Sequence, residues 1–305
     1  MKSTRGPLGP SRGKALLSVT MAVLLLSLVV ALSPGCGSKN ASVPTLDPFK
    51  GLDSGLASAS GLSSGGFVVD GCLFTTRQGD ELEGVLPPVK PQVLSKGNTN
   101  VKKVALTIDD GWNADMRILQ LLKDSKVKFT AFLIGGRNMV ESNPDFVRQI
   151  QEAGGEVCSH TWDHYVMRGK DEATVMMEIW KSQGIITDIT HRVLPYIRFS
   201  GGAYDQPALD WTAREGYWVV NWSASDNDTA SGVTVDSQVA ALLSGCSNGA
   251  ILLCHWGGHN TYEVLARAIP EIQKRGFEVT SLSEVMEGTP YVLTEKAYRE
   301  HNKKK

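Results

Sequence analysis

The sequence predicts an α/β fold, an irregular seven-stranded (β/α) barrel with a short N-terminal extension. Apolar, strand-like runs alternate with helical segments from Val101 onward, and each pair spans about 25 to 35 residues, as βα units require. This alternation favours a mainly parallel sheet that closes or nearly closes into a barrel, with its chemistry at the carboxyl ends of the strands. The expected strands cover residues 101–108, 128–134, 155–159, 196–200, 217–222, 250–255 and 277–281.

Three helices between these strands have recognisable ends. One is expected over 114–126, where apolar side chains recur at helical spacing. A second begins at Pro144, after the potential cap Asn143, and ends at Gly154. A third covers 264–275 and stops at a glycine.

The first 35 residues have the pattern of an export signal. Four basic residues precede an apolar run over 15–32. Cys36 follows this run and resembles the lipidation cysteine of bacterial lipoproteins, so we expect a lipid-anchored protein. An uncleaved membrane anchor and ordinary secretion are the alternatives, because the run is near the lower length limit for crossing a bilayer. All three place the folded part outside the cytoplasm.

Composition and charge restrict the class of partner. With 42% apolar and 21% charged residues, the chain has the composition of a folded globular protein. Removing residues 1–35 deletes four basic and no acidic side chains, which takes the formal charge from −1 to −5. A mildly acidic protein is a poor partner for nucleic acid, which is therefore not expected. The sequence carries no signal for an oligomeric state.

The remaining organisation follows from composition. A Gly/Ser-rich tether is expected over 36–66, then a strand-bearing extension over 67–97, the main domain over 98–293, and a basic tail over 294–305.

Four cysteines remain if Cys36 carries lipid. A bridge between Cys158 and Cys254 is not expected, because alternation along their strands points them to opposite faces. If any bridge forms, the expected one joins Cys72 and Cys246.

Two adjacent carboxylates, Asp109 and Asp110, end the strand expected over 101–108 and precede Gly111. Two carboxylates this close at the end of a buried strand repel each other. A cation or a basic group between them offsets this repulsion. A solvated turn is the alternative for Asp-Asp-Gly taken alone.

Histidines follow two further strands. His160 and His164 lie four residues apart, which is ligand spacing for a transition metal if the backbone there makes a helical turn. His255 ends the strand expected over 250–255. In a barrel these three histidines would face the two carboxylates. A common site explains five such residues at three strand ends better than chance does. The other histidines are assigned no function, although His259 lies near enough to His255 to be a minor candidate.

At these residues the chain resembles the polysaccharide deacetylases with a NodB-type domain, carbohydrate esterase family four, over roughly 101–292. The segment 106–111 matches the family's first motif, 160–164 its second, and 249–255 its fifth.

The third and fourth motifs match only in part. Arg198 and the closing Gly-Ala-Tyr are present, but both prolines of the third motif are missing, and Gly201 stands in place of its aromatic residue. Asp228 of the fourth motif is present, whereas Thr229 replaces a tryptophan. These departures concern the substrate groove more than the chemistry.

The resemblance implies a role for each site residue. Metal ligation falls to Asp110, His160 and His164, with zinc expected and cobalt, iron or nickel also compatible with this donor set. The remaining expected roles are general base for Asp109, general acid for His255, support of Asp109 by Arg198, orientation of His255 by Asp228, an oxyanion-hole N–H from Gly201, and substrate contact by Trp222.

Less specific roles stay open for several of these residues. Arg198 can be an ion-pair partner in a polar core, and Asp228 can be a surface-loop residue. Four tryptophans near the motifs can line a sugar-binding groove, although buried packing is expected for at least two of them: Trp112, Trp162, Trp222 and Trp256.

The implied activity is metal-dependent removal of N-acetyl groups from amino sugars of a cell-wall or extracellular polysaccharide, peptidoglycan or chitin-like. An O-acetyl carbohydrate esterase and a non-catalytic surface glycan-binding protein are the alternatives. The expected partners are the polysaccharide and, through the lipid or the N-terminal anchor, the membrane.

Overall fold

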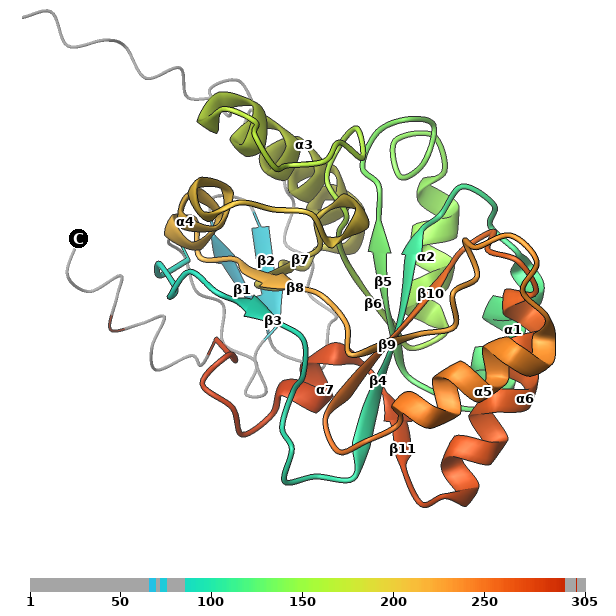
Figure 1. Cartoon of the computed structure of the whole chain (residues 1–305). Helices are drawn as coiled ribbons and strands as arrows, with labels where there is room; N and C mark the ends of the chain where they lie inside the picture. The colour runs from blue at the N-terminus through green and yellow to red at the C-terminus, as the bar shows by residue number, and fades with distance from the viewer. Residues whose placement is uncertain (1–65, 70–71, 76–85, 294–299, 301–305) are drawn as a thin grey trace, which may run out of the picture. The chain divides into compact units, whose positions relative to one another are not determined.

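The structure, a computed structural model, describes residues 66–69, 72–75, 86–293 and 300. A curled sheet of parallel strands organises it, so the predicted α/β barrel architecture is confirmed (Figure 1). The strands lie in the order β3 (Val93–Leu94), β8 (Trp218–Val220), β7 (Tyr196–Ile197), β6 (Gly155–Ser159), β5 (Phe129–Leu133), β4 (Lys103–Asp110), β10 (Ala250–His255) and β9 (Ala224–Ser225), with β11 (Glu278–Thr280) also paired to β4.

Each of the seven strands expected from the sequence forms, with bounds that shift by a few residues. Two further strands, β3 and β9, have two residues each and are the edges of the sheet among the described strands. Such short strands leave no apolar run in the sequence, which is why neither was predicted.

Strand β4 is the centre of the sheet because three strands pair with it. One edge is occupied by β10, which places His255 directly opposite Asp109. The other edge is shared: β11 pairs with Lys103–Ala105, and β5 pairs with Thr107–Asp110. Asp109 and His255, the expected base and acid, are therefore neighbours on adjacent strands.

Helices connect the strands. They are α1 (Met116–Asp124), α2 (Pro144–Glu152), α3 (Glu172–Thr190), α4 (Gln206–Arg214), α5 (Val235–Gly245), α6 (Thr261–Lys274) and α7 (Leu282–Met286). The three predicted helices correspond to α1, α2 and α6, and Asn143 caps α2 by accepting the N–H of Phe146. Helix α6 begins three residues earlier than predicted.

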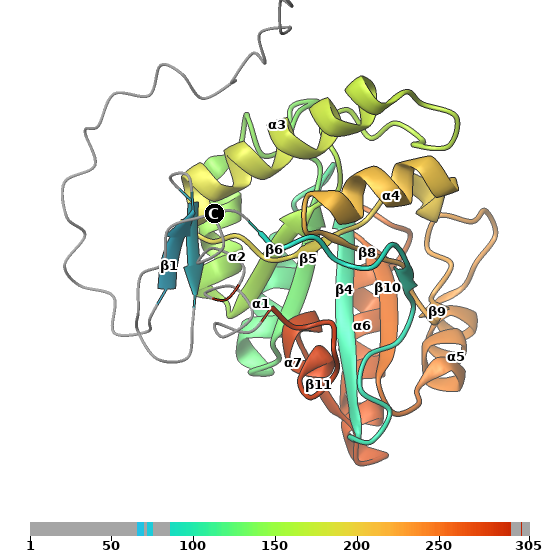
Figure 2. The same cartoon turned by 90° about the vertical axis from the view of Figure 1, so that its left-hand side faces the viewer.

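The two faces of the sheet have separate cores. Side chains on the outer face, such as Leu106 and Leu252, pack with helices α1, α2, α5 and α6, which lie along one side of β4, β5 and β10 (Figures 1 and 2). Side chains on the inner face, such as Phe132 and Ile251, pack with α7. Asp109, two residues beyond Thr107 on β4, points to this inner side with it.

Stability depends on the outer core, so Leu252→Ala is expected to lower the free energy of unfolding by about 2 to 5 kcal/mol. Leu252 is completely buried on β10, and truncation leaves a cavity between sheet and helices. Urea unfolding measures the change. Met116→Ala, at a position 45% exposed, is the control and should shift stability by no more than about 0.5 kcal/mol.

The cysteines give one correction. Cys158 lies in the inner core and Cys254 in the outer core, both as buried free thiols. Cys246 is also a free thiol, and its Sγ contacts the carbonyl of Leu242 at 3.3 Å. The expected bridge to Cys72 is therefore not formed, because Cys246 at the end of α5 is held against its own helix.

The N-terminal expectations lie largely outside the described residues. The export segment 1–35, Cys36, the tether up to residue 65 and all of the tail except residue 300 belong to this group. Strands β1 (Gly66–Val69) and β2 (Cys72–Thr75) form a separate antiparallel pair. Across the part of the chain that the structure covers, every helix is too short or too polar to cross a membrane.

Candidate metal centre and active site

The acidic pair sits at a left-handed turn that ends β4. Asp110 has φ +75° and Gly111 has φ +99°. In a regular strand adjacent side chains point to opposite faces, so this turn lets Asp110 reach the cluster that Asp109 borders. Glycine is favoured at position 111 because its φ of +99° is a backbone conformation that other residues rarely adopt. The alternative of a solvated turn is wrong, since Asp109 is 2% exposed.

His160 is held by the strand ends on either side. Its N–H donates to Leu133, and its Nδ1 lies 2.8 Å from the carbonyl oxygen of Arg198. A carbonyl only accepts, so Nδ1 carries the proton and Nε2 presents a lone pair. Nε2 lies 3.3 Å from Oδ1 of Asp110.

His164 completes the cluster from the same loop. Its Nε2 lies 3.2 Å from Oδ1 of Asp110. The loop is not the helical turn that the four-residue spacing suggested, because Thr161 has φ +68° and His164 has φ +58°. An irregular loop brings the two imidazoles together instead, with their ring centroids 4.9 Å apart.

These residues fit a metal cation. One ligand atom from each of Asp110, His160 and His164 lies within 4.8 Å of the others. Burial raises the pKa of the Asp110 carboxyl, but the two imidazoles outweigh it and hold that pKa well below its usual range. Oδ1 of Asp110 is buried, and no residue in the described part of the chain donates a hydrogen bond to it. Three acceptor atoms this close need positive charge between them, either imidazole protons at low pH or a divalent cation.

Asp109 lies beside this cluster and is held by Arg198. Nη1 of Arg198 donates to Oδ1 of Asp109 at 2.6 Å, while Oδ2 of Asp109 lies 3.7 Å from Nε2 of His160. Arg198 is completely buried, and its remaining donors bond Thr107, Val220 and Asn221. It is therefore a core ion-pair partner and a contact of Asp109 at once.

The predicted substrate residues lie around Arg198. Its guanidinium stands 5.7 Å from the ring of Trp222. A Cβ on Gly202 would lie 3.0 Å from that ring, so the turn containing Gly201 packs directly against Trp222. Gly201 itself has φ +60° within the short 3-10 turn Ser200–Gly202. The other three tryptophans near the motifs differ: Trp256 is buried, Trp162 is partly buried and Trp112 is 47% exposed. The expectation that at least two of the four are buried is therefore wrong.

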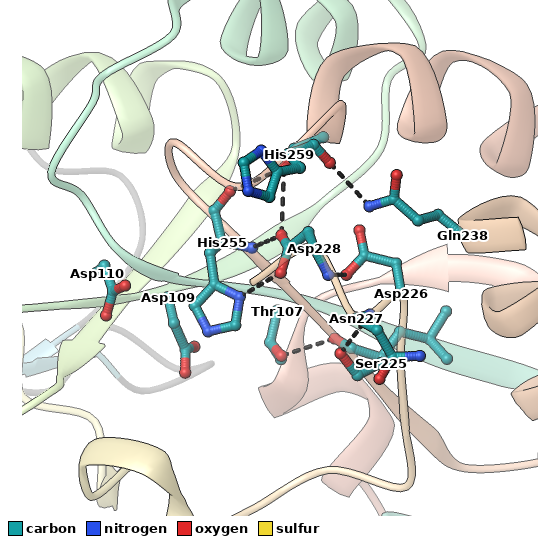
Figure 3. Close-up of polar contacts among 12 residues, drawn as sticks. Thr107, Asp109, Asp110, Ser225, Asp226, Asn227, Asp228, Gln238, His255 and His259 are labelled. Carbon is teal, nitrogen blue, oxygen red and sulfur yellow. Dashed lines mark hydrogen bonds and ion pairs between the residues drawn. The ribbon is translucent and has the colours of Figure 1, made fainter. Parts of the chain in front are cut away.

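His255 and Asp228 form a closely bonded pair (Figure 3). Oδ1 of Asp228 accepts from Nδ1 of His255 at 2.6 Å, and Oδ2 accepts the backbone N–H of the same residue at 2.6 Å. Asp228 is completely buried, so the surface-loop alternative is wrong. Burial lowers the pKa of His255, but Asp228 outweighs it and raises that pKa to about 9. His259 contributes its backbone N–H, which donates to the carbonyl of Asp228.

Sequence reasoning missed Asp226, a second carboxyl behind Asp228 (Figure 3). It is 1% exposed, and its Oδ1 accepts the N–H of Asp228 at 3.3 Å. Burial, with the neighbouring charge of Asp228, raises the pKa of Asp226 to about 7. The signal was an acidic residue two positions before Asp228, at the end of a strand too short to predict.

The pH dependence of activity is expected to change in Asp228→Asn. An acid must be protonated to act, so the wild type loses activity as pH rises through about 9. Without the carboxylate, that loss should move toward the ordinary histidine pKa of about 6.5. The contribution of the ion pair to folding is likewise complete below about pH 6.5 and lost as pH rises through 9. Profiles of kcat/KM from pH 5 to 10 measure the shift; identical alkaline limbs would argue against an acid role for His255.

Fold and site together define an α/β-barrel protein with a candidate mononuclear cation centre at the carboxyl ends of its strands. The family model described as polysaccharide deacetylase matches residues 96–220. A peptidoglycan-N-acetylglucosamine deacetylase of Bacillus cereus is 30% identical over 194 residues, which cover 61% of this chain and 89% of that protein. The chain belongs to the polysaccharide deacetylase family.

Two solved structures place this assignment in context. A peptidoglycan N-acetylglucosamine deacetylase is 27% identical with a TM-score of 0.60, over 64% of this chain and 92% of that one. A mutant of a family 4 pseudoenzyme from Bacillus anthracis, described as having restored enzymatic activity, is 25% identical with a TM-score of 0.61, over 70% of this chain and 78% of that one.

Proposed function

We propose that this protein is an extracytoplasmic, metal-dependent hydrolase that removes N-acetyl groups from amino sugars, with peptidoglycan as the first candidate substrate. The observation that carries the proposal is the convergence of Asp110, His160 and His164 on one point with Asp109 beside them. The Bacillus cereus relative, named for N-acetylglucosamine of peptidoglycan, supports the substrate class.

The chain supplies a base, an acid and their supports. When bound, a divalent cation polarises a carbonyl and lowers the pKa of water. Arg198 occupies Oδ1 of Asp109, which leaves Oδ2 to take the proton of the attacking water. His255 donates a proton to the amine as the C–N bond breaks, because an unprotonated amine is a poor leaving group. Asp228 orients the imidazole and keeps it protonated.

The proposal also names the cation, the substrate contacts and the membrane anchor. Zinc is the proposed cation because two imidazoles and one carboxylate with open positions suit it, and cobalt, iron and nickel suit the same donors. Gly201 is proposed to offer a backbone N–H to the oxyanion, and Trp222 to contact substrate. Anchoring through lipid on Cys36 would keep the protein at the outer face of the membrane.

The test is acetate release from N-acetylglucosamine oligomers and from peptidoglycan. Treatment with a chelator is expected to abolish release, and added Zn²⁺ or Co²⁺ to restore it, since the base and the acid alone do not polarise the carbonyl. Release that survives chelation, with metal absent by elemental analysis, would contradict the proposal. Acetate from acetylated xylan alone would indicate an esterase, and glycan retention without acetate a binding protein.

A further inference from the structure

The loop that carries both histidines of the cluster is held by a buried carboxylate from α3. We propose that Glu178 is a positioning residue of the metal centre, setting the geometry of the loop 160–164 and hence its affinity for a divalent cation. This inference rests on the proposed function for the existence of the cation, and it concerns a residue that the sequence motifs do not include.

Two hydrogen bonds join the Glu178 side chain to this loop. Its Oε2 accepts the backbone N–H of Trp162 at 2.9 Å and that of Asp163 at 2.8 Å. Glu178 is completely buried within α3, and its Oε1 is buried with no hydrogen-bond partner among the described residues. A buried carboxylate is costly unless its charge is compensated, so these two N–H groups are a specific arrangement.

The loop needs such an anion because of its backbone. Thr161 at φ +68° and His164 at φ +58° stand on either side of Trp162 and Asp163. Two consecutive N–H groups turned to the same side form a concavity that binds negative charge. Glu178 fills it and stabilises a conformation that two non-glycine residues adopt only at some cost.

The opposite side of the loop is held by the two glycines that follow β5. Gly135 and Gly136 donate their N–H groups to the carbonyls of Thr161 and Trp162 at 2.9 and 3.0 Å. One turn beyond Glu178, the hydroxyl of Ser182 bonds that of Ser159, directly before His160, at 2.9 Å. The loop therefore lies between the residues that follow β5 and helix α3, and Glu178 holds the two N–H groups at its middle.

The test measures cobalt binding by the full chain. Protein freed of metal with a chelator is titrated with Co²⁺, following visible absorption for the geometry of the site and chelator competition for the dissociation constant. Glu178→Gln removes the charge and buries an amide NH₂ where Oε1 now lacks a partner. It should raise the dissociation constant by about 10-fold or more and alter the cobalt spectrum, with Glu178→Ala at least as severe.

The matched control is Gln183→Leu, a buried polar position on α3 whose side-chain amide, among the described residues, bonds Thr187 of its own helix and no residue of the loop 160–164. It should bind cobalt as the wild type does. Amide hydrogen exchange of residues 160–164 in the metal-free protein should be faster in Glu178→Gln and unchanged in the control.

The outcomes separate the two proposals. Wild-type affinity and spectrum in Glu178→Gln would overturn the positioning role and leave the proposed function intact. Should Glu178→Ala fail to fold, Glu178→Gln alone decides. A wild type that takes up no cobalt would overturn the proposed function, and this inference with it.

Discussion

Asp109→Asn is expected to reduce acetate release by about 10²- to 10⁴-fold while the protein still binds its cation. The amide cannot take a proton from water. Its carbonyl oxygen can still accept from Nη1 of Arg198, which leaves an NH₂ group where the basic Oδ2 stood. Asp109 is not among the three ligand candidates, so cobalt affinity should change much less than activity.

The control for this variant is Asp188→Asn, which makes the same chemical change at an exposed position on α3. It should leave acetate release and cobalt affinity unchanged. Steady-state kinetics with N-acetylglucosamine oligomers measure both variants. An Asp109→Asn protein that keeps most of its activity would show that the base lies elsewhere.

His255→Ala is expected to separate amide from ester hydrolysis. Loss of the acid should cost about 10²- to 10⁴-fold with an N-acetylated sugar, because the amine must be protonated to leave. With an activated acetyl ester such as 4-nitrophenyl acetate the loss should be much smaller, since that leaving group departs as an anion. The two rates are measured on the same preparation.

The control is His259→Ala, because His259 contacts Asp228 through its backbone N–H, which alanine retains. It should remain within a few-fold of the wild type on both substrates. Equal losses on amide and ester in His255→Ala would point to a positioning role for this histidine and not to proton donation.

The sequence predicted the fold well because the main strands are buried on both faces. Runs such as 104–108 and 250–254 have no solvated side and therefore appear as continuous apolar segments. The edge strands β3 and β9 have two residues each and no such run, so they could not be found. Barrel geometry then explains why residues from separate strand ends meet.

The site was predicted less completely, and for a physical reason. The motifs identify side chains that face one another, such as Asp110 and His160. They do not show which distant residue supports a loop. In the sequence, Glu178 is indistinguishable from the charged residues on the exposed side of a helix, although the structure buries it completely. The disulfide expected at Cys246 was wrong for a similar reason, because pairing depends on where the end of α5 points and not on the number of cysteines.

The sharing of one edge of β4 by β11 and β5 bears on how the protein matures. The strand that carries Asp109 is completed by β10 and β11 from the C-terminal end of the domain, and Thr107 bonds Leu252, 145 residues away. Contacts of such sequence separation form late, because a long loop must close first. A chain that ended before β11 would leave Lys103–Ala105 unpaired on that edge of β4, so the strand that carries the acidic pair is completed only when β11 has been made.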